Sequence, residues 1–153
     1  MSQFNPAASF QNFGVGIVVH RAAETILADV DIFSIDGGPV LLTGFLGHVT
    51  VDIGSGSADI EFDLDPDDGG SDVTLSTILV IDGDVAGTMY TLNTSFAGVA
   101  IATLDHALNA SLEVPIALAA GDIVLDRSGS EAGEIEWFAT YIPLVETATL
   151  TAV

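Results

Sequence analysis

The stretch Asp59-Ile60-Glu61-Phe62-Asp63-Leu64-Asp65 alternates acidic and apolar residues without a break. Successive side chains of a β-strand point to opposite faces, so three apolar side chains share one face and four carboxylates share the other. A strand of this kind is half-buried, and its apolar face needs a second layer to cover it. The stretch therefore predicts a β-protein with an acidic outer surface.

Further strand patterns continue in both directions from this stretch, separated by turn residues at 36–39, 54–57, 66–71 and 82–84. One strand is expected from residue 23 to 32, with Ile26, Ala28, Val30 and Ile32 on one face. Others are expected at 40–53, with Gly44 and Gly47 as bulges or bends, and at 73–81, 87–93, 112–118, 122–125 and 134–142. Residues 147–153 fit an edge strand or a tail, and 96–110 a short helix. This spacing predicts an all-β fold: a single antiparallel β-sandwich or jelly-roll-like barrel.

The charge of the chain argues against some classes of binding partner. It has 153 residues, 22 Asp and Glu, two Arg (Arg21 and Arg127), no Lys and no Cys. Its formal net charge is -20, yet 49% of its residues are hydrophobic, which fits an ordered domain rather than a disordered acidic tail. Without a basic patch we expect no direct binding to nucleic acid or to an anionic membrane. Neither a secretory signal nor an apolar run of about 20 residues is visible.

The first 16 residues differ from the rest. They are polar, lack a sustained period and carry Phe4, Phe10 and Phe13. We expect residues 1–16 to be an extended N-terminal arm and residues 17–153 a single β domain. The three rings either contact another molecule or pack on their own domain.

Residues 63–72 form the densest acidic cluster, in which Asp63, Asp65, Asp67 and Asp68 could supply oxygen ligands to Ca²⁺. The fit to a helix-loop-helix calcium loop is poor, because the glycine is displaced to Gly69 and position twelve is Thr74. A solvated acidic hairpin loop is the alternative, and the residues favour it.

Nothing in the sequence specifies an enzyme. The known nucleophile, phosphate-binding and paired-histidine motifs are absent, and His20, His48 and His106 lie far apart. Trp137, Ala139 and Tyr141 share a strand face, which favours a place in the core or in a subunit interface over ligand stacking. We therefore expect no catalytic residues and no required cofactor.

Four segments resemble a group of small virion proteins of tailed phages. They are residues 39–50 (PVLLTGFLGHVT), 83–92 (GDVAGTMYTL), 114–123 (VPIALAAGDI) and 133–144 (GEIEWFATYIPL). In order, they are similar to an early strand, a central block and two C-terminal blocks of that group. The resemblance spans residues 39–144. The basic residue usual in the tryptophan block is Glu136 here, and Lys is absent throughout, which fits a particle from seawater.

The resemblance implies a structural protein, most like a capsid decoration (cement) protein. Such proteins bind the outside of the head, commonly as trimers at threefold positions, and clamp neighbouring copies of the major capsid protein against internal DNA pressure. It further implies synthesis in the host cytoplasm and a final place on the outer capsid surface.

Two alternatives stay open. The same segments could serve another phage component, such as a head fibre, tail or baseplate protein. The acidic composition also fits a cation- or glycan-binding β-sandwich module from a salt-adapted organism.

Overall fold

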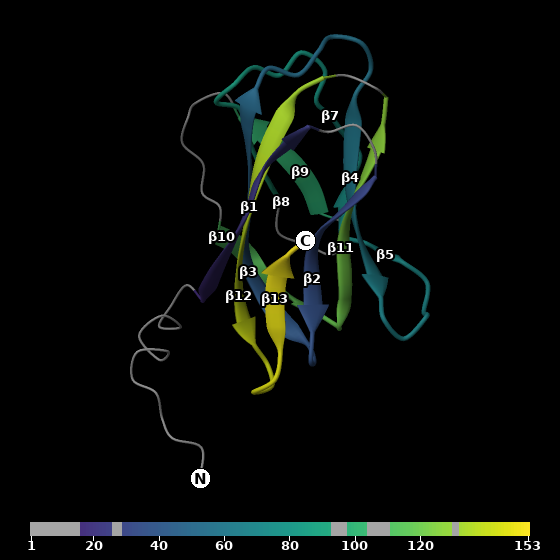
Figure 1. Cartoon of the computed structure of the whole chain (residues 1–153), viewed down its shortest axis with the longest axis vertical. Coiled ribbons are helices and arrows are strands. Elements are labelled where there is room, and N and C mark those ends of the chain that lie inside the picture. Colours follow the sequence, from purple (N-terminus) through teal and green to yellow (C-terminus); the bar gives the residue numbers. More distant parts are fainter. Residues whose placement is uncertain (1–15, 26–28, 93–97, 104–110, 130–131) are drawn as a thin grey trace.

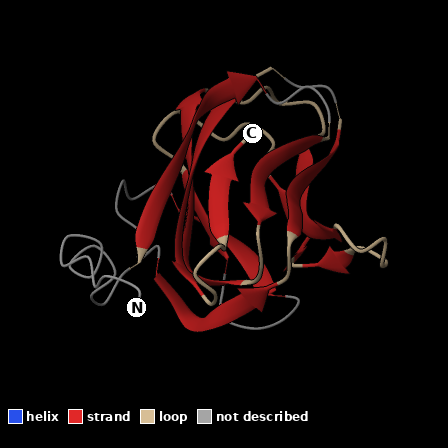
Figure 2. Cartoon of the chain, turned by 60° about the horizontal axis from the view of Figure 1, so that its bottom comes forward, coloured by secondary structure: helices blue, strands red, loops and turns tan. Residues whose placement is uncertain are grey.

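The computed structural model describes residues 16–25, 29–92, 98–103, 111–129 and 132–153. This part of the chain is all β, and Figure 2 shows two layers of strands with no helix in it. The strands are β1 (Ile17–Thr25), β2 (Val30–Asp36), β3 (Val40–Val51), β4 (Asp59–Pro66), β5 (Val73–Thr74), β6 (Ser76–Thr77), β7 (Leu79–Val80), β8 (Met89–Leu92), β9 (Gly98–Thr103), β10 (Ser111–Leu118), β11 (Gly121–Ser128), β12 (Glu134–Pro143) and β13 (Thr149–Ala152). The predicted β-sandwich is confirmed.

The larger sheet has seven strands: six follow the order β1-β12-β3-β8-β9-β6, and β10 also pairs with β3 (Figure 1). The long strand β3 organises it. Along one side β3 pairs with β12; on the other side its first half pairs with β10 and its second half with β8. The pairs are antiparallel except β6 with β9, which are parallel.

The smaller sheet has six strands in the order β13-β2-β11-β4-β5, with β7 also on β4. The strand β4 confirms the predicted alternation, because Ile60, Phe62 and Leu64 are buried while their neighbours face outward. The predicted turn at 36–39 is confirmed as well. Gly37 and Gly38 adopt φ values of 72° and 141°, which favour glycine.

The two sheets meet in an aromatic core. The ring of Phe45 lies 5.0 Å from that of Phe62 and 5.6 Å from that of Trp137, between centroids. Gly47 pairs with Trp137 on one side and Tyr90 on the other, and those two rings stack at 6.2 Å. A Cβ atom at Gly47 would come within 2.3 Å of the indole ring. The glycine therefore makes room for Trp137.

The expected strand over residues 23–32 is wrong. Strand β1 ends at Thr25 in the larger sheet and β2 begins at Val30 in the smaller one. The expected alternation also fails in β2, where Ile32 and Phe33 are both buried. The pairing with β11 skips Ile32, which forms a β-bulge there.

Three other predictions need correction. The bulges of β3 lie at Thr43 and Thr50, whereas Gly44 and Gly47 stay in register with β12. Residues 73–81 form three two-residue strands, of which β6 joins the other sheet. Residues 98–103 form strand β9 rather than helix; the remainder of the expected helix, 96–97 and 104–110, lies outside the described residues.

Arg21 closes one open side of the sandwich. Its side chain, only 6% exposed, points inward from edge strand β1. There Nε donates a hydrogen bond to the main-chain oxygen of Val153 (2.9 Å) and Nη2 pairs with Glu24 (2.5 Å). An inward-pointing charge on an edge strand also discourages that strand from pairing with another molecule.

Candidate functional site

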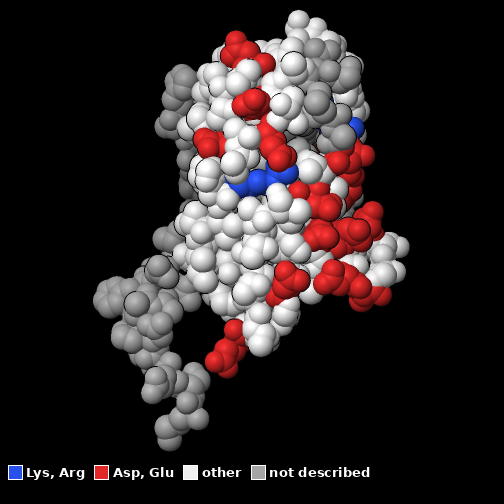
Figure 3. All heavy atoms as spheres, viewed as in Figure 1, with Lys and Arg blue, Asp and Glu red and all other residues white. Residues whose placement is uncertain are grey.

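Carboxylates gather on the outer face of the smaller sheet. The pairing of β11 with β4 places Asp122 beside Asp65 and Asp126 beside Glu61. We call this surface the acidic face; it comprises Asp31, Asp36, Asp59, Glu61, Asp63, Asp65, Asp122 and Asp126. Figure 3 shows acidic side chains concentrated over β11, β4 and the loop next to β5.

Asp63 and Asp126 interact directly on this face. The pKa of Asp126 is raised to about 6, most of all by burial and then by a hydrogen bond with Asp63 and by the charges of Asp63, Asp29 and Glu61. Two neighbouring carboxyl groups avoid repulsion by sharing a proton. The acidic face therefore takes up a proton more readily than isolated aspartates would.

An open hollow of about 290 Å³ lies at the Asp59 end of the acidic face. Its lining includes Asp29, Glu61, Asp126 and Arg127. Asp29 accepts a hydrogen bond from the main-chain N–H of Arg127 (2.8 Å), and Asp59 accepts one from Ser128 Oγ (3.1 Å). Sites for small molecules are usually deeper and more apolar, so this open hollow lacks the character of a small-molecule site.

The four proposed calcium ligands do not converge. Asp63 turns toward Asp126, and Asp68 Oδ1 accepts a hydrogen bond from the N–H of Gly70 (2.9 Å). Asp65 and Asp67 are exposed, one at the end of β4 and the other in the turn after it. Across the described ranges, no three His, Cys, Asp or Glu side chains are placed to hold a metal ion. Binding of Ca²⁺ by this loop stays a prediction.

The outer face of the larger sheet carries a different cluster. Glu136 on β12 contacts His20 on β1 (Oε2 to Nε2, 3.1 Å) and His48 on β3 (Oε1 to Nδ1, 2.8 Å). The hydrogen bond with His48 lowers the pKa of Glu136, partial burial opposes this, and His20 lowers the pKa further. One carboxylate thus links three neighbouring strands.

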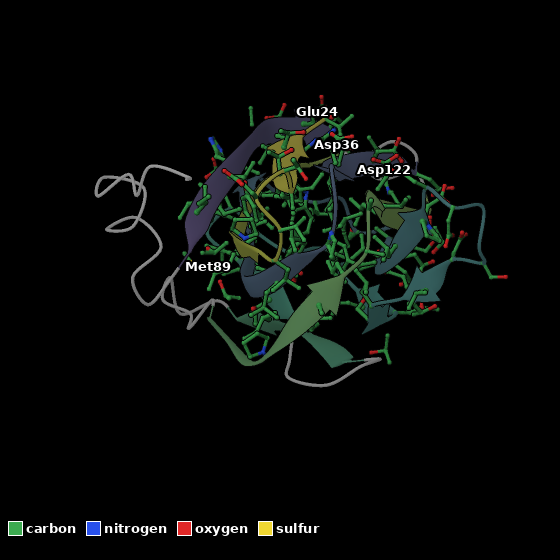
Figure 4. The ribbon with its side chains drawn as sticks, turned by 90° about the horizontal axis from the view of Figure 1, so that it is seen from below. Glu24, Asp36, Met89 and Asp122 are labelled. Atoms are coloured by element: carbon green, nitrogen blue, oxygen red, sulfur yellow. The ribbon has the colours of Figure 1, made fainter. Side chains whose placement is uncertain are left out.

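Apolar side chains lie on the same outer face, next to the Glu136 cluster. His20 stacks on Phe138 with ring centroids 4.5 Å apart, and Phe138 pairs with Leu46 across β12 and β3. We call the surface made of Val18, Leu41, Leu46, Phe138 and Ile142 the apolar patch; none of its members is charged, and Val18 is 62% exposed. Figure 4 shows Met89 of the larger sheet on the opposite side of the sandwich from Asp36 and Asp122.

The sequence patterns did not predict that Glu136, His20 and His48 lie close together. Glu136 is 116 residues from His20 and 88 from His48. The strands that carry His48 and Glu136 were expected, but strand β1, which carries His20, and the order β1-β12-β3 were not. The available signal was weak: His48 and Glu136 occupy outward positions of their strands.

The other predicted site residues divide into two groups. Trp137, Ala139 and Tyr141 are buried in the core, in agreement with the interpretation favoured from their shared face. Phe4, Phe10 and Phe13 lie outside the described residues, as does His106.

Comparison with known proteins adds no relative. No family model matches the chain, and neither the curated proteins nor the solved structures give a significant match. Within the ranges described, no helix is long and apolar enough to cross a membrane.

Proposed function

We propose that this protein is a structural component of a tailed-phage particle, a decoration protein that binds the outside of the capsid and stabilises it. The observation that supports this most is the division of its surface. One sheet face carries eight carboxylates (Asp31, Asp36, Asp59, Glu61, Asp63, Asp65, Asp122 and Asp126), while the other carries an apolar patch. A rigid module with one face for solvent and one for contact suits a protein whose role is to cover a shell.

The segments that resemble phage virion proteins support the same proposal. Residues 39–50 lie in and next to β3, and the other three segments contribute its pairing partners β8, β10 and β12. The resemblance therefore falls mainly on β3 and its neighbours in the larger sheet, which carry all members of the apolar patch except Val18 on β1.

The mechanism we propose is mechanical. The apolar patch and the arm residues Phe4, Phe10 and Phe13 bury apolar area against the major capsid protein and against neighbouring copies. Trimers would match the threefold positions of a shell. The acidic face points outward, where repulsion between carboxylates keeps decorated particles apart.

Capsid binding tests this proposal. Purified protein is added to tailed-phage shells that lack a decoration protein, and bound protein is measured by sedimentation. We expect saturable binding that raises the temperature at which shells disrupt. Deletion of residues 1–15 should reduce occupancy while the domain stays folded by circular dichroism. Absence of binding by the full chain would contradict the capsid-binding proposal. Full occupancy by the truncated chain would contradict the proposed role of the arm.

Mass in solution supplies an independent test. A trimer in light scattering, at three times the chain mass of 15.7 kDa, would favour the threefold arrangement. A stable monomer would contradict a homotrimer in solution. The number of copies bound at each site of the shell would then be measured instead.

A second candidate is a cation-binding module, favoured by the Asp63–Asp126 pair and the acidic hollow. Titration with Ca²⁺ by calorimetry tests it, with Asp63→Asn as the variant and Asp36→Asn as the control. Saturable binding lost only in Asp63→Asn would support this function. Equal heats in all three proteins would count against it.

A further inference from the structure

The first 15 residues differ in charge from the rest of the protein. They contain no Asp, Glu, Lys or Arg, whereas the remaining residues hold all 22 acids and both arginines. They also hold Phe4, Phe10 and Phe13, three of the eight phenylalanines of the chain. The three rings gain free energy by leaving water, and the segment has no charged side chain that could pair with a charged surface.

The apolar patch has matching chemistry. It offers Val18, Leu46 and Phe138 without a carboxylate among its members. The acidic face is a poorer alternative, because phenylalanine rings lying on it would strip water from carboxylates without providing hydrogen bonds.

The chain leaves the described residues beside the patch. Gly16 packs against the main chain of Tyr141 and adopts a φ of 99°, so the chain turns where it enters edge strand β1. Val18, two residues later, is already part of the patch. Fifteen extended residues span up to about 50 Å, and the larger sheet, six strands across, is about 24 Å wide at the usual strand spacing. The arm is therefore long enough to cross the whole face.

We propose that, in the free protein, residues 1–15 lie across the apolar patch of their own molecule, with their phenylalanine rings against Val18, Leu46 and Phe138. The covalent tether favours this over the patch of a second copy, since it holds the arm near its own patch at a high effective concentration. This inference concerns the isolated protein and does not depend on what the protein binds.

A spin label tests the contact directly. The chain has no Cys, so Ser9→Cys carries a single label in the arm. We expect paramagnetic broadening of the methyl signals of Val18 and Leu46, while Ile78, exposed between β6 and β7, stays sharp. Equal broadening of all three, or none, would overturn the proposal.

Mixing separates the molecule's own arm from that of a second copy. Spin-labelled protein without isotopes is mixed with isotope-labelled protein without the spin label. We expect the broadening to vanish in this mixture. Broadening of Val18 and Leu46 that survives mixing would overturn the intramolecular contact in favour of arm exchange.

Dye binding tests the energetics by a mutant cycle. Deletion of residues 1–15 should at least double the fluorescence of the apolar dye ANS. In the Val18→Thr/Leu46→Thr background the same deletion should have little effect, and in the control Ile78→Thr the full effect. Circular dichroism verifies that each variant folds. Equal increases in all three backgrounds would overturn the proposal.

Discussion

At Gly47 the core leaves no room for a side chain. A Cβ atom there would meet the Trp137 ring, which is packed by Phe45, Phe62 and Tyr90. We expect Gly47→Ala to lower the free energy of unfolding by about 1–3 kcal/mol, the range for overpacked cores. Urea denaturation measures this change.

The matched control is Gly70→Ala. Gly70 lies in an exposed loop, its φ is not positive, and its nearest neighbour is the Asp68 side chain. Its effect should stay within about 0.5 kcal/mol, as for most surface changes. Similar losses at both glycines would argue against a specific conflict with Trp137.

Asp126 makes stability depend on pH in the direction opposite to that of most aspartates. Because its pKa is raised from 3.8 to about 6, its contribution is complete below pH 3.8 and is lost as pH rises through 6. At neutral pH its charge is held next to those of Asp63 and Glu61. We expect Asp126→Asn to be more stable than the wild-type protein at pH 7.5, with a smaller difference at pH 5.

Urea denaturation at both pH values measures this prediction. Asp122→Asn serves as the control because it removes the same charge from the same strand, opposite Asp65 rather than beside Asp63. If both variants gained the same stability at pH 7.5, net charge rather than the Asp63–Asp126 pair would be the cause.

At the scale of elements, Glu136 connects β1, β12 and β3. Its pKa is lowered below 4.5, so its contribution is present above that pH and is lost as pH falls through the lowered value. We expect Glu136→Gln to cost about 1 kcal/mol at pH 6, the usual size for a hydrogen bond, and little at pH 2.5. Denaturation at the two pH values provides the measurement.

A double-mutant cycle with His48→Gln tests the cause. His48 makes the shorter of the two contacts, so Glu136→Gln should cost less once His48 is replaced. Additive effects of the two changes would indicate that the carboxylate acts through something other than the histidine.

The elements themselves differed in how well the sequence predicted them. Strands such as β4 and β12 were predictable, because strict alternation and a flanking turn or proline define them locally. The change of sheet between β1 and β2 was not, since two strands in different sheets can continue one alternating pattern. For β9, the spacing of Ile101 and Leu104 suggested a helix, but pairing with β8 outweighed that local preference.

The candidate site was less predictable than the fold, for the same reason. The acidic face could be anticipated from β4 alone, whereas the partners of its carboxylates come from β11, more than 50 residues later. The expected calcium loop grouped acids by sequence, while the fold groups Asp63 with Asp126 instead.

For the molecule as a whole, the net charge of -20 predicts a dependence on salt. Like charges on the acidic face repel, and salt screens them, with a Debye length of about 10 Å at 0.1 M and about 3 Å at 1 M. We expect the melting temperature in calorimetry to rise with NaCl over this range. A constant melting temperature would contradict substantial repulsion.

The triple variant Asp59→Asn/Glu61→Gln/Asp65→Asn locates this effect. These residues lie on one strand of the acidic face, so removing their charges should lessen the rise with salt. An unchanged salt dependence would place the repulsion elsewhere on the protein.

The concentration of carboxylates on one sheet also displaces the centre of negative charge from the centre of mass. These carboxylates contribute to the protein an electric dipole component that runs across the two layers, from the acidic face toward the larger sheet. In the field of any negatively charged surface, a torque would turn the acidic face away before contact. The larger sheet, with its apolar patch, would then arrive first, so a random approach becomes an oriented collision.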